Sequence, residues 1–325
     1  MPSPSQALTT LSPDLATLFE YEYAESEPRF VGNQILPLLS VPKQSGNFGR
    51  ITLETLLENS AQTRRAPTSG YQRRQFEFTE DSYATEEHGI EEYLDDREVA
   101  MYADYFTAQA VAVRRAVNTI LTAHEQRVAS AVMDSTYYTG QAATHVTPAT
   151  AWDVASSTPI EDIEAAWNKL RDNSGFRANA LILSEAVYRV LRSHPDVVAR
   201  VESSGAGFAA RARDVNLSQL ASVFDIPKII VGGGMYNTSN PNESASLADI
   251  WGTDVLVAKV ANSNDMREPC IGRTFHWSAD GSISGGLVET YREEAVRSNI
   301  VRVRHDVQEK ILYQDLGVMI DSVLS

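Results

Sequence analysis

Two glycine-rich segments are the first places to look for chemistry, because the backbone N–H groups of glycine loops can hold phosphates. The segment Gly205–Ala210 fits the loose dinucleotide pattern G-x-G-x-x-A, with Asp225 about the right distance on. The residues before it, 195–202, have a helical pattern, whereas that site requires a preceding strand. Gly232–Gly234 follows a predicted strand but lacks the rest of a phosphate motif. We interpret the first as a loop and the second as a turn needing positive φ.

The histidines and the cysteine also lack a motif for catalysis or metal binding. The patterns G-x-S-x-G and H-E-x-x-H do not occur, and the single Cys270 excludes a cysteine-built zinc site. We read Cys270 as a small core residue. His124 lies on an apolar stripe, where we expect it to be packed or hydrogen-bonded. The six histidines are scattered without metal-ligand spacing: His88, His124, His145, His194, His276 and His305. We therefore predict no catalytic residue, no cofactor and no metal.

The charge of the chain excludes one large class of function. Of 325 residues, 43 are acidic and 28 are Lys or Arg, which gives a formal net charge of −15. Tight binding to nucleic acid needs a basic face, so we do not expect it. No apolar run approaches the ~18 residues of a membrane-spanning helix. The N-terminus lacks the pattern of a signal peptide, so we expect a soluble protein that folds inside the cell.

The first 98 residues divide by composition into three segments. Residues 1–45 hold six prolines and little periodicity, which predicts either a disordered tail or an arm that orders on a neighbouring surface. Residues 46–80 predict a long two-stranded excursion, with alternation at 73–79 and four arginines free of acids nearby: Arg64, Arg65, Arg73 and Arg74. Two strands alone are marginal in water, so this hairpin must rest on something else.

The segment from residue 80 to residue 98 is strongly acidic, and two readings stay open. Its carboxylates can form a solvated face before a helix N-terminus. Alternatively, the arginine hairpin of one subunit docks on the acidic strip of another. The carboxylates we single out for this contact are Glu86, Glu87, Glu91 and Glu92.

The remaining chain predicts one very long helix and then a mixed module. Apolar residues at steps of three or four predict a helix over 96–133, about 57 Å long at ~1.5 Å per residue and capped by Asp95 or Asp96. Later signals include a capping box at Thr158–Glu161 and a helix stop at Gly175. We predict strands over 180–183, 228–231, 254–260, 287–291, 300–304 and 311–313, and helices from Ser184, from Pro195 and over 217–224. Residues 316–324 are too short to classify.

Local phrases along residues 80–325 resemble one protein family. Tyr83–Glu92 and Asp95–Glu98 precede the long helix; Trp152-Asp153, Ala180–Leu183 with His194-Pro195, Leu220–Phe224, Ile250–Gly252 and Gly272–Trp277 follow. Each phrase is weak alone, but their shared order is similar to that in major capsid proteins of tailed bacteriophages, a siphophage-like subgroup of the HK97-type fold. The arm and hairpin match that family in position and character only.

The resemblance implies an α+β architecture and a structural function. It implies an N-terminal arm (1–45), an extended E-loop (46–80), a peripheral domain (81–147 and 288–325, with spine helix 96–133) and an α/β axial domain (148–287). Such a subunit self-assembles as hexamers and pentamers into an icosahedral shell enclosing double-stranded DNA without binding it tightly. The implied location is the virion, after assembly in the host cytoplasm. The implied partners are a scaffold protein, a portal and possible cement proteins.

Two features depart from some relatives. Some weld subunits through a lysine on the E-loop, but residues 46–80 contain no lysine. We therefore expect noncovalent contacts or cement proteins. Some carry a long N-terminal scaffolding segment, for which the predicted arm leaves no room.

Two other functions stay open. An encapsulin-like nanocompartment shares the fold and encloses enzymes, and a soluble α/β enzyme with a helical extension would need a concave polar site.

Overall fold

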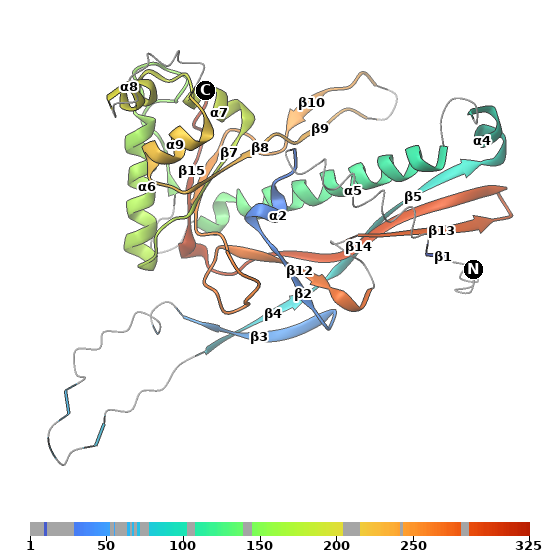
Figure 1. Ribbon diagram of the computed structural model, residues 1–325, viewed down its shortest axis with the longest axis horizontal. Coiled ribbons are helices and arrows are strands. Elements are labelled where there is room, and N and C mark those ends of the chain that lie inside the picture. Colours follow the sequence, from blue (N-terminus) through green and yellow to red (C-terminus); the bar gives the residue numbers. More distant parts are fainter. Residues whose placement is uncertain are drawn as a thin grey trace.

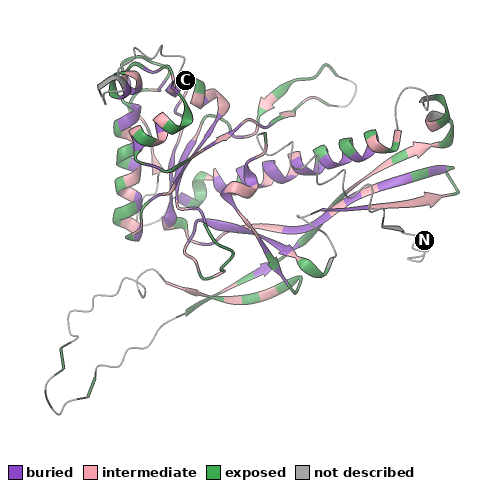
Figure 2. Cartoon of the chain, viewed as in Figure 1, coloured by how far each residue is buried: buried purple, intermediate pink, exposed green. Residues whose placement is uncertain are grey.

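The computed structural model describes residues 10–11, 29–52, 55, 64–65, 67, 70–71, 78–102, 108–138, 145–203, 215–240, 243–280 and 286–325. It contains two units, each built on its own sheet, and the long helix α5 passes from one to the other (Figure 1). A two-stranded hairpin projects away from both units (Figure 1). The buried residues follow the two sheets and the inner side of α5, whereas the hairpin strands are largely exposed or half-buried (Figure 2).

The first unit is built on a six-stranded sheet, here called the long sheet. Its central strand, β14 (Ser298–Ile311), pairs antiparallel with three different strands along its length. The other strands are β1 (Thr10–Leu11), β13 (Leu287–Glu293), β5 (Glu86–Asp95), β12 (Gly272–Trp277) and β2 (Leu38–Val41). Only β2 with β12 is a parallel pair. Alternation along β14 turns Val301 and Val303 toward α5 and leaves Arg302 and Arg304 on the opposite face.

The acidic stretch after the hairpin forms strand β5 of the long sheet. It pairs with β14 over its full length, from Glu86 opposite Val307 to Asp95 opposite Ser298. Ile90 and Leu94 pack with the apolar cluster beneath α5. The prediction from the sequence rested on the number of carboxylates. It did not use the alternation of apolar with polar residues, which is typical of a strand. Asp95 does accept a hydrogen bond from the Arg97 N–H at the start of the next helix, 2.7 Å long.

The predicted long helix is represented by α4 (Asp96–Tyr102) and α5 (Ala108–Val132). Residues 103–107 lie outside the described part of the chain. The 25 residues of α5 span about 37 Å at ~1.5 Å per residue. Val113, Val117 and Ile120 pack against the long sheet, and Val128 and Val132 pack in the second unit. One apolar stripe therefore joins the two cores.

The second unit contains a five-stranded sheet with cores on both faces. The strand order is β6 (His145–Val146), β15 (Gly317–Ile320), β11 (Val255–Ala258), β7 (Ala180–Ser184) and β8 (Lys228–Gly232). Every residue of β7, β11 and β15 is buried, as expected for strands covered on both faces. One face packs on α6 (Pro159–Ser174), α7 (Glu185–Leu191), α8 (Pro195–Ser203) and α9 (Leu217–Phe224). The other face packs on the end of α5.

Several local predictions in this unit are confirmed and one is wrong. Gly175, at φ 72°, ends α6, and the Ser184 side chain accepts a hydrogen bond from the Val187 N–H at the start of α7. Helix α9 begins and ends where the pattern predicted. The Thr158 side chain makes no capping bond, because its backbone, at ψ 67°, is not in the extended conformation typical of an N-cap. Residues 316–324, left unclassified, contain β15.

The glycines of the turn after β8 have a different purpose from the one expected. None of Gly232, Gly233 and Gly234 has a positive φ. A Cβ on Gly232 would lie 2.2 Å from the Trp251 ring, so this glycine is needed for close packing rather than for a left-handed turn. The chain continues into a hairpin of β9 (Met235–Asn237) and β10 (Leu247–Asp249). The segment Gly205–Ala210 lies outside the described residues.

The N-terminal segment and the hairpin complete the fold. Residues predicted as part of an arm instead form α2 (Gly32–Ile35) and β2 within the body of the protein. Ile35 and Leu36 are fully buried there. The predicted excursion is confirmed at its base, where β3 (Ser45–Ile51) pairs with β4 (Phe78–Ala84). Of the predicted strand 73–79, only residues 78 and 79 are described, and both belong to β4.

Candidate subunit-contact surfaces

The base of the hairpin is fixed to the long sheet by an aromatic stack. Tyr83 of β4 lies parallel to Phe275 of β12, with ring centroids 4.9 Å apart and an interplanar angle of 3°. Phe48 of β3 lies 5.7 Å from the same Phe275 ring. Tyr83 and Phe275 are both buried. Such aromatic pairs contribute about 0.5–1.5 kcal/mol beyond their buried area, so the hairpin starts from a rigid root.

Polar contacts reinforce this root. Lys310 of β14 donates to Asp81 and to the Ser82 carbonyl. Burial acts to raise the pKa of Asp81, but the Lys310 ammonium and the Ser82 N–H hold that pKa below its ordinary value. Arg50 donates to the Leu312 carbonyl, and the Tyr313 hydroxyl donates to the Ile51 carbonyl at 3.0 Å. Both hairpin strands are therefore bound to the end of β14.

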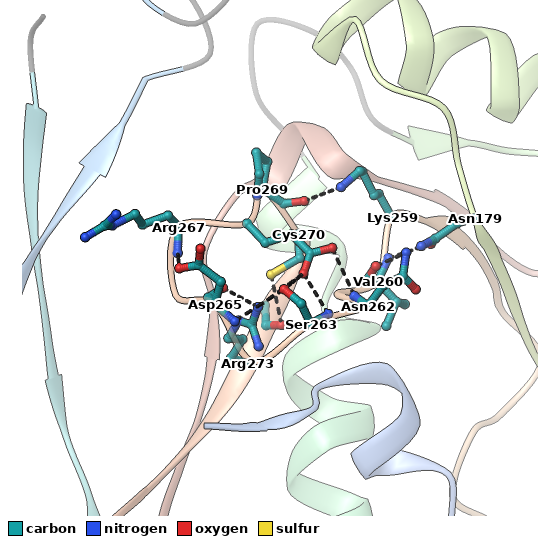
Figure 3. Close-up of polar contacts among 12 residues, drawn as sticks. Asn179, Lys259, Val260, Asn262, Ser263, Asp265, Arg267, Pro269, Cys270 and Arg273 are labelled. Atoms are coloured by element: carbon teal, nitrogen blue, oxygen red, sulfur yellow. Dashed lines mark hydrogen bonds and ion pairs between the residues drawn. The ribbon is translucent and has the colours of Figure 1, made fainter. Parts of the chain in front are cut away.

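A compact loop between β11 and β12 lies beside the root (Figure 3). The Glu268 carboxylate accepts hydrogen bonds from the Asn262 and Ser263 N–H groups, at 3.0 and 2.8 Å, and from the Ser263 hydroxyl. The buried Arg273 donates to the Asp265 carbonyl at 2.6 Å. Met266 and Arg267 of this loop face the hairpin strands across a hollow of about 100 Å³ that is open to solvent. The loop is a preformed wall next to the projecting hairpin.

Two of the predicted arginines, Arg64 and Arg65, are described and lie between β3 and β4 in the sequence. Arg64 and Arg65 are exposed, and the Arg65 guanidinium lies over the Tyr71 ring, 4.8 Å from its centroid. Arg73 and Arg74 lie outside the described residues.

Three of the four predicted carboxylates form ion pairs within the subunit. Glu91 bonds to Arg302 at 2.6 Å and accepts from the Tyr291 hydroxyl at 3.1 Å. Glu92 lies 3.5 Å from Arg115 of α5, and Glu87 lies 3.5 Å from Arg304. Glu86, at the start of β5, is exposed. Because exposed pairs contribute only about 0–1 kcal/mol, Glu86 and Glu87 are the carboxylates best placed to meet a second chain.

Sequence reasoning missed the buried carboxylate Glu125, which ties three parts of the chain together. Glu125 lies on α5 and is 1% exposed. It accepts hydrogen bonds from the N–H groups of Val31 and Gly32, at 2.9 and 2.7 Å, and from Trp251 Nε1 at 2.7 Å. Burial raises its pKa, and these donors oppose that rise. A lone Glu between the apolar positions of α5 was the signal that could have revealed it.

The residues considered for chemistry fit a structural role in this geometry. Cys270 is fully buried, and burial raises the pKa of its thiol, which disfavours the reactive thiolate. His124 is buried and hydrogen-bonded, as predicted. In the described ranges, no three His, Cys, Asp or Glu side chains are arranged to hold a metal ion. Nor does any described helix combine the length and apolar character needed to cross a membrane.

Comparisons with known proteins agree with this geometry. The family model of phage major capsid protein E matches residues 107–233, less than half of the chain. The major capsid protein of Burkholderia phage BcepMu is 24% identical over 300 residues, covering 90% of this chain and 91% of that protein. Among solved structures, a phage-related protein from Bordetella bronchiseptica RB50 has a TM-score of 0.71 and 22% identity. It covers 97% of this chain and 98% of that one.

A chain in a solved phage capsid structure has a similar fold as well. The capsid protein of cyanophage P-SCSP1u has a TM-score of 0.57 and 10% identity, covering 88% of this chain and 85% of that one. At these identities the structural matches concern the fold, and they extend over nearly the whole chain. The predicted resemblance to phage major capsid proteins is therefore confirmed, and the chain has the HK97-type fold of those proteins.

Proposed function

We propose that this protein is the major capsid protein of a tailed bacteriophage, a structural subunit located in the virion. The observation that carries this function is the agreement of the fold along almost the entire chain, together with a capsid family match across α5 and the module that follows. A capsid subunit acts by geometry and needs no catalytic residue or cofactor, and we assign none.

The way in which the hairpin is attached supports self-assembly into hexamers and pentamers. Its root is fixed by the Tyr83–Phe275 stack and by Lys310. Its strands project from the body and bury little of their own surface (Figure 2). Two strands without a supporting surface are marginal in water. A neighbouring subunit would supply that surface, and the rigid root would set the direction in which the hairpin reaches it.

The two sheets suggest a revised domain division for such a subunit. We assign the long sheet with α5 to the peripheral domain and the five-stranded sheet with α6–α9 to the axial domain. Relative to the boundaries expected from the sequence, β12 moves to the peripheral domain, and β6 and β15 move to the axial domain. The E-loop is residues 46–80, and the arm is the chain before residue 29, whose strand β1 lies on the edge of the long sheet.

The charge suggests how the shell treats its contents. A net charge of −15 disfavours tight contacts with phosphates, so double-stranded DNA can be enclosed without being held. Subunits would contact one another through Arg64, Arg65, Arg73 and Arg74 of one hairpin and Glu86 and Glu87 of the next chain. Scaffold, portal and cement proteins are the further partners that this function requires or permits.

Sedimentation velocity of the purified chain, with negative-stain microscopy of the fast fraction, tests this function. We expect ring-shaped capsomers or closed shells, alone or with a scaffold protein from the same phage added. A compact monomer under all these conditions would count against a capsid subunit. An encapsulin-like shell protein would share the fold, so the contents of shells isolated from the native host decide between enclosed DNA and enclosed enzymes.

Charge reversal tests the proposed contact. We expect the double variant Arg73→Glu with Arg74→Glu to lower the yield of shells at low salt, because like charges then meet across the subunit boundary. The matched control is Arg189→Glu with Arg192→Glu on and after α7, in the other unit. If the hairpin variant assembles in unchanged yield and its assembly is insensitive to salt, a charge-guided contact is ruled out.

A further inference from the structure

Three histidines that are far apart in the sequence lie together between α5 and the long sheet. His88 of β5 is the register partner of His305 of β14, and their ring centroids are 5.7 Å apart at 83°. His124 of α5 lies over the same place, 5.9 Å from His305 at 76°. His124 and His305 are buried, and His88 is half-buried. The fold thus makes a cluster of residues whose spacing gave no motif.

Hydrogen bonds define how protons are distributed in this histidine cluster. Arg127 donates to Nε2 of His305 at 3.1 Å, so the His305 ring accepts and is neutral. Arg127 also donates to Glu309 at 3.1 Å. The two ring nitrogens of His124 face Glu309 Oε1 at 2.7 Å and Asn33 Oδ1 at 3.1 Å. One carboxylate therefore already faces two basic side chains.

The other charged groups nearby do not provide a second counter-charge at His305. Glu86 of β5 lies on the His88 side and is exposed. Asp306 follows His305 on β14, but its side chain lies on the opposite face and contacts Gln44 at 3.3 Å. Glu125 of α5 is directed to Val31, Gly32 and Trp251. Within the described ranges, Glu309 is the carboxylate that bonds to the cluster.

We propose that this histidine cluster makes the contact between α5 and the long sheet acid-sensitive, because His88 and His305 can take up a proton only when α5 separates from β14. A proton on either ring would add a charge beside Arg127 and His124, where Glu309 is the carboxylate bonded to the cluster among the described residues. Separation of the helix exposes the rings to water, which solvates that charge. The geometry therefore couples proton uptake to the loosening of one particular contact.

The pKa shifts agree with this geometry. Burial and the positive groups His124 and Arg127 lower the pKa of His305 to about 3. Burial and Arg127 also lower the pKa of His88. Burial acts to raise the pKa of Glu309, but the His124 hydrogen bond and Arg127 lower it to about 2, so Glu309 stays charged.

The sign of the pH effect follows from linkage. The ordinary histidine pKa is 6.5, and that of His305 in the fold is about 3. Stability is therefore complete above pH 6.5 and is lost as the pH falls, because the open state binds a proton that the closed state does not. Ordinary carboxylates titrate near pH 4, so the range from pH 6.5 to pH 5 reports mainly on histidines and on Glu125, whose raised pKa acts in the opposite direction, toward greater stability as the pH falls.

Hydrogen exchange of the full chain, corrected for the intrinsic pH dependence of exchange, tests the local effect. We expect the opening equilibrium of α5 residues 120–128 to rise by up to about tenfold for each pH unit below 6 for each proton taken up. Helix α6, which packs on the other unit, should change less. Equal changes in α5 and α6 would overturn the proposal.

A substitution identifies the histidine. Between pH 6.5 and pH 5, the slope of the free energy of unfolding against pH reports how many protons are taken up on unfolding. We expect His305→Gln to lower that number by about one. His145→Gln is the matched control, because His145 pairs with Asp321 at 2.9 Å in the five-stranded sheet; it should leave the α5 response unchanged. An unchanged steepness in His305→Gln would overturn the proposal. If that variant fails to fold, NMR titration of the wild-type imidazoles decides, since a His305 ring that titrates near pH 6.5 contradicts it.

Discussion

The core between the five-stranded sheet and its helices and the contacts of α5 bury different kinds of side chain. The core between the five-stranded sheet and α6–α9 consists of apolar residues, among them Leu181, Leu183 and Val257. The contact of α5 with the long sheet and the N-terminal segment also buries Glu125, His124 and Glu309. Apolar contacts are non-directional and tolerate small shifts, whereas buried charges depend on particular donors. Single polar changes and pH should therefore act most strongly on the contacts of α5, which include Glu125 near the end of α5 that packs in the second unit.

The largest effect should follow loss of the Glu125 carboxylate. Glu125→Ala leaves the N–H groups of Val31 and Gly32 and the Trp251 indole without their acceptor. Each buried donor left unpaired costs about 1–3 kcal/mol, so we expect the free energy of unfolding to fall by about 4 kcal/mol. Urea denaturation measures the loss, and hydrogen exchange should show it first in residues 31–36.

Glu125→Gln is the matched control for this change. The amide keeps the size of the side chain and one acceptor oxygen, so it should lose less stability than the alanine variant. Equal and small losses in both variants would show that the three donors find water, and the contrast between the two regions would then be weaker than the buried contacts indicate.

An apolar truncation in the core between the five-stranded sheet and its helices should lower the free energy of unfolding somewhat less, and without a dependence on pH. Leu183→Ala removes a fully buried side chain from the core on α6–α9. Such changes cost about 2–5 kcal/mol, and we expect about 3 kcal/mol by urea denaturation. The loss should be the same at pH 6.5 and pH 5, because the truncated side chain does not titrate. A loss that varies with pH over this range would contradict the contrast between the two regions.

The elements of the second unit were also the ones that could best be predicted from the sequence. Ser184, Gly175 and the limits of α9 follow from local signals, namely a side-chain cap, a left-handed stop and a short apolar stripe. These signals depend on neighbours within a few residues, so one sequence contains them. The same holds for the burial of β7, a continuous apolar run.

The contacts of α5 and of the long sheet could be predicted less well from the sequence, because they join distant residues. Glu125 binds Val31, 94 residues earlier, and only the fold reveals that residues 29–41 belong to the body. The acidic segment was not predicted as a strand, since the pairing of β5 with β14 depends on residues more than 200 positions later. The candidate contact residues show the same limit: Glu91 and Glu92 were singled out for a partner subunit, yet Arg302 and Arg115 of their own chain already bind them.

The smallest predicted effect separates buried from exposed charges among the contacts of α5 themselves. Arg115 of α5 pairs with Glu92 of β5 at 3.5 Å, but 70% of the Arg115 side chain is exposed. Exposed pairs contribute about 0–1 kcal/mol and are screened by salt, so Arg115→Ala should change the free energy of unfolding by less than about 1 kcal/mol. A double-mutant cycle with Glu92→Gln in urea, at low and high salt, measures the coupling. If that coupling approached the loss from Glu125→Ala, burial would not be what distinguishes these contacts, and charge alone would govern them.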